Sequence, residues 1–109
     1  MITITINRNH AGLVTGFSSL GHAGYAEYGE DIVCAGASAL VINAINSVEA
    51  FTDMKYEVSS DEEEGRIEFS FQGLPDAKAG LLMDSLVLGL ESIQNDYGDE
   101  FLSLQFKEV

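Results

Sequence analysis

The sequence contains one cysteine, Cys34, and one of its two histidines, His22, precedes it within the segment Gly21–Leu40 (GHAGYAEYGEDIVCAGASAL). A thiolate is a strong nucleophile, and a neighbouring imidazole can take up its proton and later protonate a leaving group. These two residue types are therefore enough for nucleophilic catalysis, provided that the fold brings them together.

The residues around Cys34 predict that it lies at the start of a helix. A run of small and apolar residues follows Asp31, and a carboxylate is among the preferred N-cap side chains. With Asp31 as the cap, the helix runs from about Ile32 to about Phe51 and Cys34 is its third residue. At that position the aligned peptide dipoles favour thiolate over thiol.

A purely structural interpretation of these residues competes with the catalytic one. A lone cysteine on an apolar helix is usually a small core residue, and a lone loop histidine usually has no special role. The position of Cys34 favours catalysis, because a structural thiol has no reason to lie in a first helical turn beside a loop rich in glycine, tyrosine and acid.

That loop also carries the candidate substrate-binding residues. Gly24 and Gly29 predict permissive hinges, and the tyrosines and acids of this loop could contact apolar and basic side chains of a peptide. These residues are Tyr25, Glu27, Tyr28 and Glu30. Ser38 lies one predicted turn beyond Cys34, so its hydroxyl could reach the same substrate, unless it bonds back to the preceding turn.

The charge of the chain limits its partners. Eighteen acids against five lysines and arginines give a net charge of −13, which repels nucleic acid and anionic membranes and attracts a basic partner. One cysteine excludes an internal disulfide and any cysteine-cluster metal site, and two histidines in different contexts argue against zinc. We therefore expect no metal and no cofactor.

Length and hydropathy predict one cytoplasmic domain over residues 1–109. The N-terminus alternates like a strand and lacks the basic segment and apolar run of a signal peptide. No uninterrupted apolar stretch is long enough to span a bilayer. A thiol outside any disulfide suits a reducing compartment.

The periodicity of the chain predicts an α+β fold. Five strands, two helices and the turns between them follow the order β-β-α-β-β-α-β, with both helices packed on one face of an antiparallel or mixed sheet. The predicted strands are Ile2–Asn7, Leu13–Ser19, Met54–Ser59, Arg66–Phe71 and Leu102–Phe106. His10 lies at the tip of the first hairpin, and the acidic segment Ser60–Gly65 is a solvated tip of the second. A second helix starts after Pro75 and Asp76.

Two apolar stripes along the first helix predict that it is buried on most sides. The first stripe consists of Val33, Ala37, Leu40, Ala44, Val48 and Phe51, and its neighbour of Ile32, Ala35, Ala39 and Ile42. In the second helix, Leu81 and Leu88 lie off the main apolar stripe. The helices thus carry more apolar surface than one sheet face can cover, which predicts a homodimer.

Three short pieces of the sequence resemble a known family. Gly21-His22-Ala23, Asp31-Ile32-Val33-Cys34-Ala35 and Ser38-Ala39-Leu40 resemble motifs of the ribosomal-processing cysteine protease (Prp) family of Firmicutes and related bacteria. The resemblance covers the whole chain in length and element order. The pair Gly36-Ala37 departs from it, because relatives often have alanine followed by a branched residue; this affects packing and leaves the chemistry intact.

The resemblance implies that His22 and Cys34 are the catalytic pair of a peptidase. Its implied substrate is large-subunit ribosomal protein L twenty-seven, from which it removes an N-terminal extension after a Phe-Phe-Ala-like or Gln-Phe-Phe segment. The resemblance also implies a homodimer, because members of the family look like homodimers. We expect a dyad with Gly21 and Asp31 in supporting roles, because Asp31 is the only nearby third candidate and capping already explains it.

Two other functions remain compatible with the sequence. A non-catalytic acidic module could hold a basic ribosomal protein during ribosome assembly, which the net charge supports and the placement of His22 and Cys34 does not. A redox-sensing thiol would also fit a single reactive cysteine, but the chain has no second cysteine to resolve an oxidised one.

Overall fold

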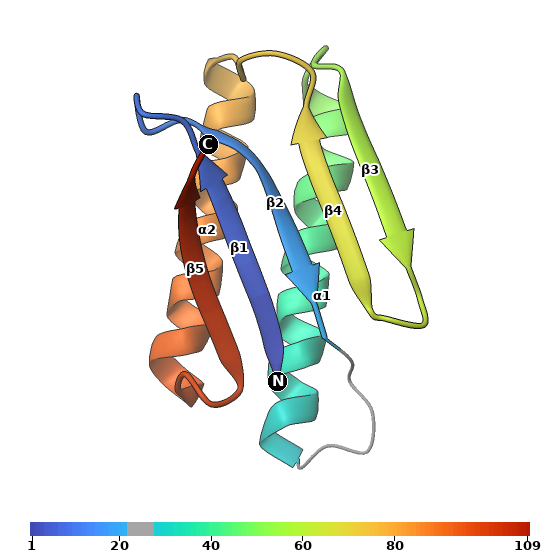
Figure 1. Ribbon diagram of the computed structural model, residues 1–109, viewed down its shortest axis with the longest axis vertical. Coiled ribbons are helices and arrows are strands. Elements are labelled where there is room, and N and C mark those ends of the chain that lie inside the picture. Colours follow the sequence, from blue (N-terminus) through green and yellow to red (C-terminus); the bar gives the residue numbers. More distant parts are fainter. Residues whose placement is uncertain (22–27) are drawn as a thin grey trace.

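The computed structural model of the chain describes the backbone of residues 1–21 and 28–109 and the side chains of residues 1–21 and 32–109. Its elements are β1 (Ile2–Arg8), β2 (Val14–Leu20), α1 (Tyr28–Phe51), β3 (Tyr56–Asp61), β4 (Arg66–Phe71), α2 (Ala77–Tyr97) and β5 (Leu102–Glu108). The predicted fold class and element order are therefore confirmed. Both helices cover the same face of the sheet (Figure 1).

The sheet has the strand order β3-β4-β2-β1-β5. β5 pairs with β1 in parallel, whereas the other three pairs are antiparallel, so the sheet is mixed. In this order the C-terminal end of β2 lies beside the N-terminal end of β4, since Leu20 pairs with Arg66. The end of the second strand therefore meets the β3–β4 turn, which comes more than forty residues later in the chain.

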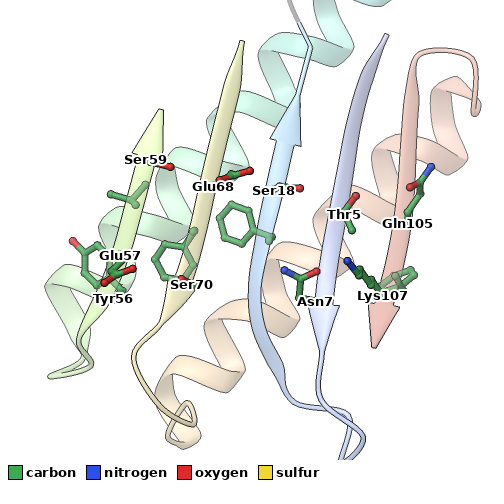
Figure 2. A pocket seen from close by; sticks show the side chains of 14 residues that line it. Thr5, Asn7, Ser18, Tyr56, Glu57, Ser59, Glu68, Ser70, Gln105 and Lys107 are labelled. Atoms are coloured by element: carbon green, nitrogen blue, oxygen red, sulfur yellow. The ribbon is translucent and has the colours of Figure 1, made fainter. Parts of the chain in front are cut away.

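Alternation along the strands separates a buried face from a polar one. Ile4, Ile6 and Phe17 point toward the helices and are almost completely buried. Phe17 stacks on Phe69 with ring centroids 5.1 Å apart. Figure 2 shows polar side chains on the opposite face, where one cross-strand row consists of Gln105, Thr5, Ser18, Glu68 and Ser59.

The first helix packs through only one of its two apolar stripes. Val33, Ala37 and Val48 are buried against the sheet, whereas Ile32 is 37% exposed and Ile42 50% exposed. The prediction that this helix is buried on most sides is therefore wrong. The fold has two layers, so the sheet covers one side of α1, α2 covers a flank, and no element of the described structure covers the rest.

By length and composition alone, the segment Ile32–Phe51 could cross a membrane, contrary to the sequence-based expectation. In the fold this segment is the helix whose buried stripe packs on the sheet. That packing is typical of the core helix of a globular domain.

The second helix begins where the sequence predicts. The Asp76 side chain caps it by accepting a hydrogen bond from the backbone N–H of Ala79 at 2.9 Å. Its buried residues, which include Met83 and Leu90, face the core. Leu81 and Leu88 are 70% and 68% exposed, so these two leucines lie off the packed stripe as predicted.

Candidate active site

Cys34 lies deeper in α1 than the sequence predicts. The helix begins at Tyr28, so Cys34 is its seventh residue, counting Tyr28 as the first. Asp31 is the fourth residue on the same count and lies within the helix, and the prediction that it is the N-cap is wrong. The Cys34 side chain is only 2% exposed and belongs to the main apolar core.

The earlier start of α1 agrees with the general preference of helix N-termini for acidic residues. Glu30 and Asp31 fall in the first turn, where carboxylates interact favourably with the positive end of the helix dipole. Gly29 lies inside this turn, so its predicted role as a loop hinge is also wrong. Because the dipole effect falls off within the first turn, it acts only weakly on Cys34. Another group must then stabilise a thiolate there.

Several predicted site residues lie outside the described part of the chain. These are His22, Tyr25 and Glu27, together with the side chains of Tyr28, Glu30 and Asp31. The residue before His22 is described, and so is the helix that carries Cys34. Figure 1 shows the end of β2 and the start of α1 at the same end of the molecule.

Gly21, predicted to support the site, is confined on two sides. Its backbone N–H donates a hydrogen bond to the carbonyl of Gly65 in the β3–β4 turn, with an N···O distance of 3.1 Å. Its φ is +146°, and a Cβ added to it would lie 2.6 Å from the Met1 carbonyl oxygen and 2.9 Å from the Ile2 Cα. The backbone of β1 leaves no room for a side chain, so this position requires glycine.

Ser38 is exposed and follows Cys34 by one helical turn. Glu49 lies three turns beyond Ser38 on the same flank of α1, and its carboxylate accepts a hydrogen bond from the Tyr56 hydroxyl of β3 at 2.7 Å. This hydrogen bond raises the pKa of Tyr56. The flank that carries Ser38 is therefore turned toward β3 and away from α2.

The opposite flank of α1 explains the run of small residues after Cys34. A Cβ on Gly36 would lie 3.4 Å from Cδ1 of Ile93 in α2, and a Cβ on Gly89 of α2 would lie 2.8 Å from Cδ1 of Leu40. The two helices thus approach closely through glycine on each side. Gly36, within the run of small residues after Cys34, is thus one of the two glycine positions where α1 and α2 meet.

The acidic turn between β3 and β4 is exposed, as predicted, but it is not isolated. Its Gly65 carbonyl accepts the Gly21 N–H, which places the turn next to the residue that precedes His22. The sequence does not reveal this contact, because the contact depends on the pairing of β2 with β4. No local pattern in the sequence specifies that pairing.

Comparison with known proteins identifies the family. A family model for the cysteine protease Prp matches residues 1–101. The ribosomal processing cysteine protease Prp of Bacillus subtilis is 39% identical over 103 residues, which cover 91% of this chain and 92% of that protein. This chain belongs to the cysteine protease Prp family. It is therefore a cysteine protease, as the sequence predicts.

Solved structures of another Prp protease match the fold described above. The crystal structure of the essential ribosomal processing protease Prp of Staphylococcus aureus in complex with a substrate peptide superimposes with a TM-score of 0.90 at 32% identity, covering 98% of this chain and all of that one (100%). A second S. aureus Prp structure, with a covalently linked product peptide, gives 0.87 at 33% identity over the same shares of the two chains, 98% and 100%. The resemblance to the Prp family is thus confirmed over nearly the whole chain.

Proposed function

We propose that this protease removes the N-terminal extension of large-subunit ribosomal protein L twenty-seven, with Cys34 as nucleophile and His22 as general base and acid. One observation carries the assignment of the nucleophile. A cysteine protease attacks with a cysteine sulfur, and this chain has a single cysteine.

The choice of His22 as the base rests on the position of His10 and on that of Gly21, the residue before His22. His10 is exposed in the β1–β2 turn, at the end of the sheet far from the start of α1 (Figure 1). His22 follows Gly21 in the chain, and Gly21 comes directly after β2, whose C-terminal end lies at the same end of the molecule as the start of α1 (Figure 1). This arrangement favours His22 over His10 as the partner of Cys34.

The buried position of Cys34 favours an imidazole partner. A thiolate that is shielded from water needs a positive charge or a hydrogen-bond donor beside it. The dipole of α1 supplies little at the seventh residue. Proton transfer from the Cys34 thiol to His22 would place an imidazolium next to the thiolate. The imidazolium is both a positive charge and a hydrogen-bond donor.

The reaction then follows in two steps. The Cys34 thiolate attacks the carbonyl carbon of the scissile bond, His22 protonates the leaving amine, and the peptide N-terminal to the cut remains as a thioester on Cys34. His22 next takes a proton from water, the hydroxide displaces the sulfur, and the first peptide leaves as a carboxylate. The covalently linked product peptide of the S. aureus protease is in keeping with such a covalent step.

The ribosomal substrate is proposed from the relatives and from charge. The relatives are named ribosomal processing proteases, and ribosomal proteins are typically basic. A net charge of −13 would favour encounter with such a protein over encounter with nucleic acid. We further assign the substrate contacts to Tyr25, Glu27, Tyr28, Glu30 and Ser38, and the reaction to the cytoplasm.

A cleavage assay tests the proposed function against the binding module. The purified protein is incubated with a peptide that spans the junction of the extension, and the products are identified by mass spectrometry. We expect two fragments with the wild type and none with Cys34→Ala or Cys34→Ser, since neither side chain provides a thiolate. Peptide that binds to the wild type and stays intact would support the non-catalytic module. Cleavage by a pure Cys34→Ala sample would exclude Cys34 as the nucleophile.

We also propose that the protease is a homodimer. Its support is the set of large apolar side chains that the two-layer fold leaves exposed on the helices, namely Ile32, Ile42, Leu81 and Leu88. Apolar surface of this kind commonly marks an interface between copies.

Analytical ultracentrifugation tests this proposal at micromolar concentration. The wild type should sediment as a dimer, and the double variant Leu81→Asp/Leu88→Asp as a folded monomer. Leu74→Asp is the matched control, because Leu74 is 68% exposed but lies in the β4–α2 connection. A monomeric wild type, or equal dissociation of the double variant and the control, would contradict the helical interface.

A further inference from the structure

The β3–β4 turn holds the residue that immediately precedes the histidine of the proposed dyad. Leu20 pairs with Arg66 at the end of the β2–β4 ladder, and the hydrogen bond from the Gly21 N–H to the Gly65 carbonyl adds one further step to it. This bond is 3.1 Å long between N and O. It ties the start of the connection from β2 to α1 to a turn remote in sequence.

Gly21 has little freedom to move away from this bond. On its other side lies β1, where the Met1 carbonyl oxygen and the Ile2 Cα leave no space even for a Cβ. The residue is thus confined between the first strand and the β3–β4 turn, with a φ of +146° that few other residue types adopt. A shift in either neighbour would change the position of Gly21.

The turn is built to keep the Gly65 carbonyl in place. The Asp61 carboxylate accepts hydrogen bonds from the backbone N–H groups of Glu63 and Glu64, at 3.0 and 3.3 Å. Gly65 has a φ of +65°, in the left-handed region that disfavours branched side chains. Arg66 forms ion pairs with Glu64 and Glu68 at 2.9 and 3.4 Å. These ion pairs stabilise the turn less than the Asp61 hydrogen bonds do, because all three side chains are exposed.

We propose that the β3–β4 turn, acting through Gly65 and Gly21, is a positioning element for His22. Consecutive Cα atoms are about 3.8 Å apart, so the confined Gly21 limits where His22 can lie. A catalytic group displaced by about 1 Å can cost on the order of 100-fold in rate. The inference rests on the proposed function, in which His22 acts on Cys34.

The test compares two hairpin glycines of positive φ. In Gly65→Val the branched side chain disfavours the left-handed backbone. Gly12→Val does the same in the β1–β2 turn, where Gly12 has a φ of +86° and an added Cβ would have no atom of the described residues within 4 Å. We expect Gly65→Val to lower kcat by about 10- to 100-fold with KM changed less than about twofold. Gly12→Val should lower the melting temperature without changing either constant. Gly65→Asn should recover most of the rate, because asparagine tolerates the left-handed region.

Alkylation of Cys34 by iodoacetamide across the neutral pH range separates positioning from general damage. Gly65→Val should slow alkylation near pH 7 and move its pH profile toward that of His22→Ala. In a His22→Ala background, Gly65→Val should have no further effect, since both changes remove the same interaction. If Gly65→Val is insoluble, Asp61→Ala replaces it in every arm, because it removes the two turn hydrogen bonds and keeps Gly65.

The outcomes distinguish this inference from the proposed function. Cleavage retained by His22→Ala would contradict the dyad itself. If His22→Ala is inactive but Gly65→Val behaves like Gly12→Val, the dyad is supported. The positioning role of the turn is then overturned. Equal slowing of alkylation by Gly65→Val with and without His22 would overturn it as well, since the turn would then act on the fold or on Cys34.

Discussion

The two hairpin turns of this protein are built in the same way and lie at different ends of the molecule. In the β1–β2 turn, Asn9 Oδ1 accepts hydrogen bonds from the N–H groups of Ala11 and Leu13, each at 3.0 Å. In the β3–β4 turn, Asp61 Oδ1 accepts two such bonds in a similar way. Each turn also contains one glycine of positive φ.

One difference between them is a tertiary hydrogen bond. The Gly12 N–H donates to the Asn9 carbonyl, a contact within its own turn. The Gly65 carbonyl instead accepts from Gly21, at the start of the connection that carries His22. The two turns therefore have similar local hydrogen bonds. Only the β3–β4 turn has the proposed functional role, because the strand order sets which residues lie beside each turn.

The largest contrast is expected between alanine variants of the two histidines. We predict that His22→Ala lowers kcat/KM by about 10²- to 10⁴-fold, the usual contribution of a general acid–base. His10→Ala should stay within about twofold of the wild type. Initial rates on the junction peptide, at concentrations below KM, provide the measurement. Comparable losses in both variants would mean that the choice of His22 over His10 is wrong.

The local elements were predictable from the sequence because their signals are local. Alternation marks the strands, and the carboxylate of Asp76 after Pro75 marks the start of α2. The start of α1 was misplaced by four residues, since Gly29 and the acids beside it suggested a loop. In the helix those acids instead favour the first turn through the dipole.

The tertiary features of the site were not predictable in this way. The sequence identified Cys34 as chemically important from its residue type and surroundings, but its burial depends on how the stripe of α1 meets the sheet. The need for glycine at position 21 comes from the backbone of Ile2, and its tie to Gly65 from the pairing of β2 with β4. Both contacts join segments distant in sequence, for which one sequence carries no readable pattern.

An intermediate effect is expected from alanine at two glycines of positive φ. Gly21→Ala forces a Cβ against the backbone of β1, whereas Gly12→Ala places one in open space. We predict that Gly21→Ala lowers kcat at least about tenfold through displacement of His22, while Gly12→Ala keeps the wild-type kcat. Circular dichroism confirms that each variant is folded before its rate is measured. Wild-type kcat in a folded Gly21→Ala variant would show that the site tolerates a shift of this residue.

The smallest expected effect concerns the acceptor side chains that brace the turns. Asn9→Ala and Asp61→Ala each remove two exposed hydrogen bonds, so both should lower the free energy of unfolding by about 0.5–1.5 kcal/mol, measured by urea denaturation. Their stability losses should be similar, but only Asp61→Ala should also lower kcat, because only its turn contacts Gly21. Asp61→Asn keeps an acceptor oxygen and removes one negative charge, and it should therefore retain both stability and kcat. If Asp61→Asn instead loses rate as much as Asp61→Ala does, the charge of the turn, and not its geometry, influences the reaction. The two turns would then differ in electrostatics as well as in position.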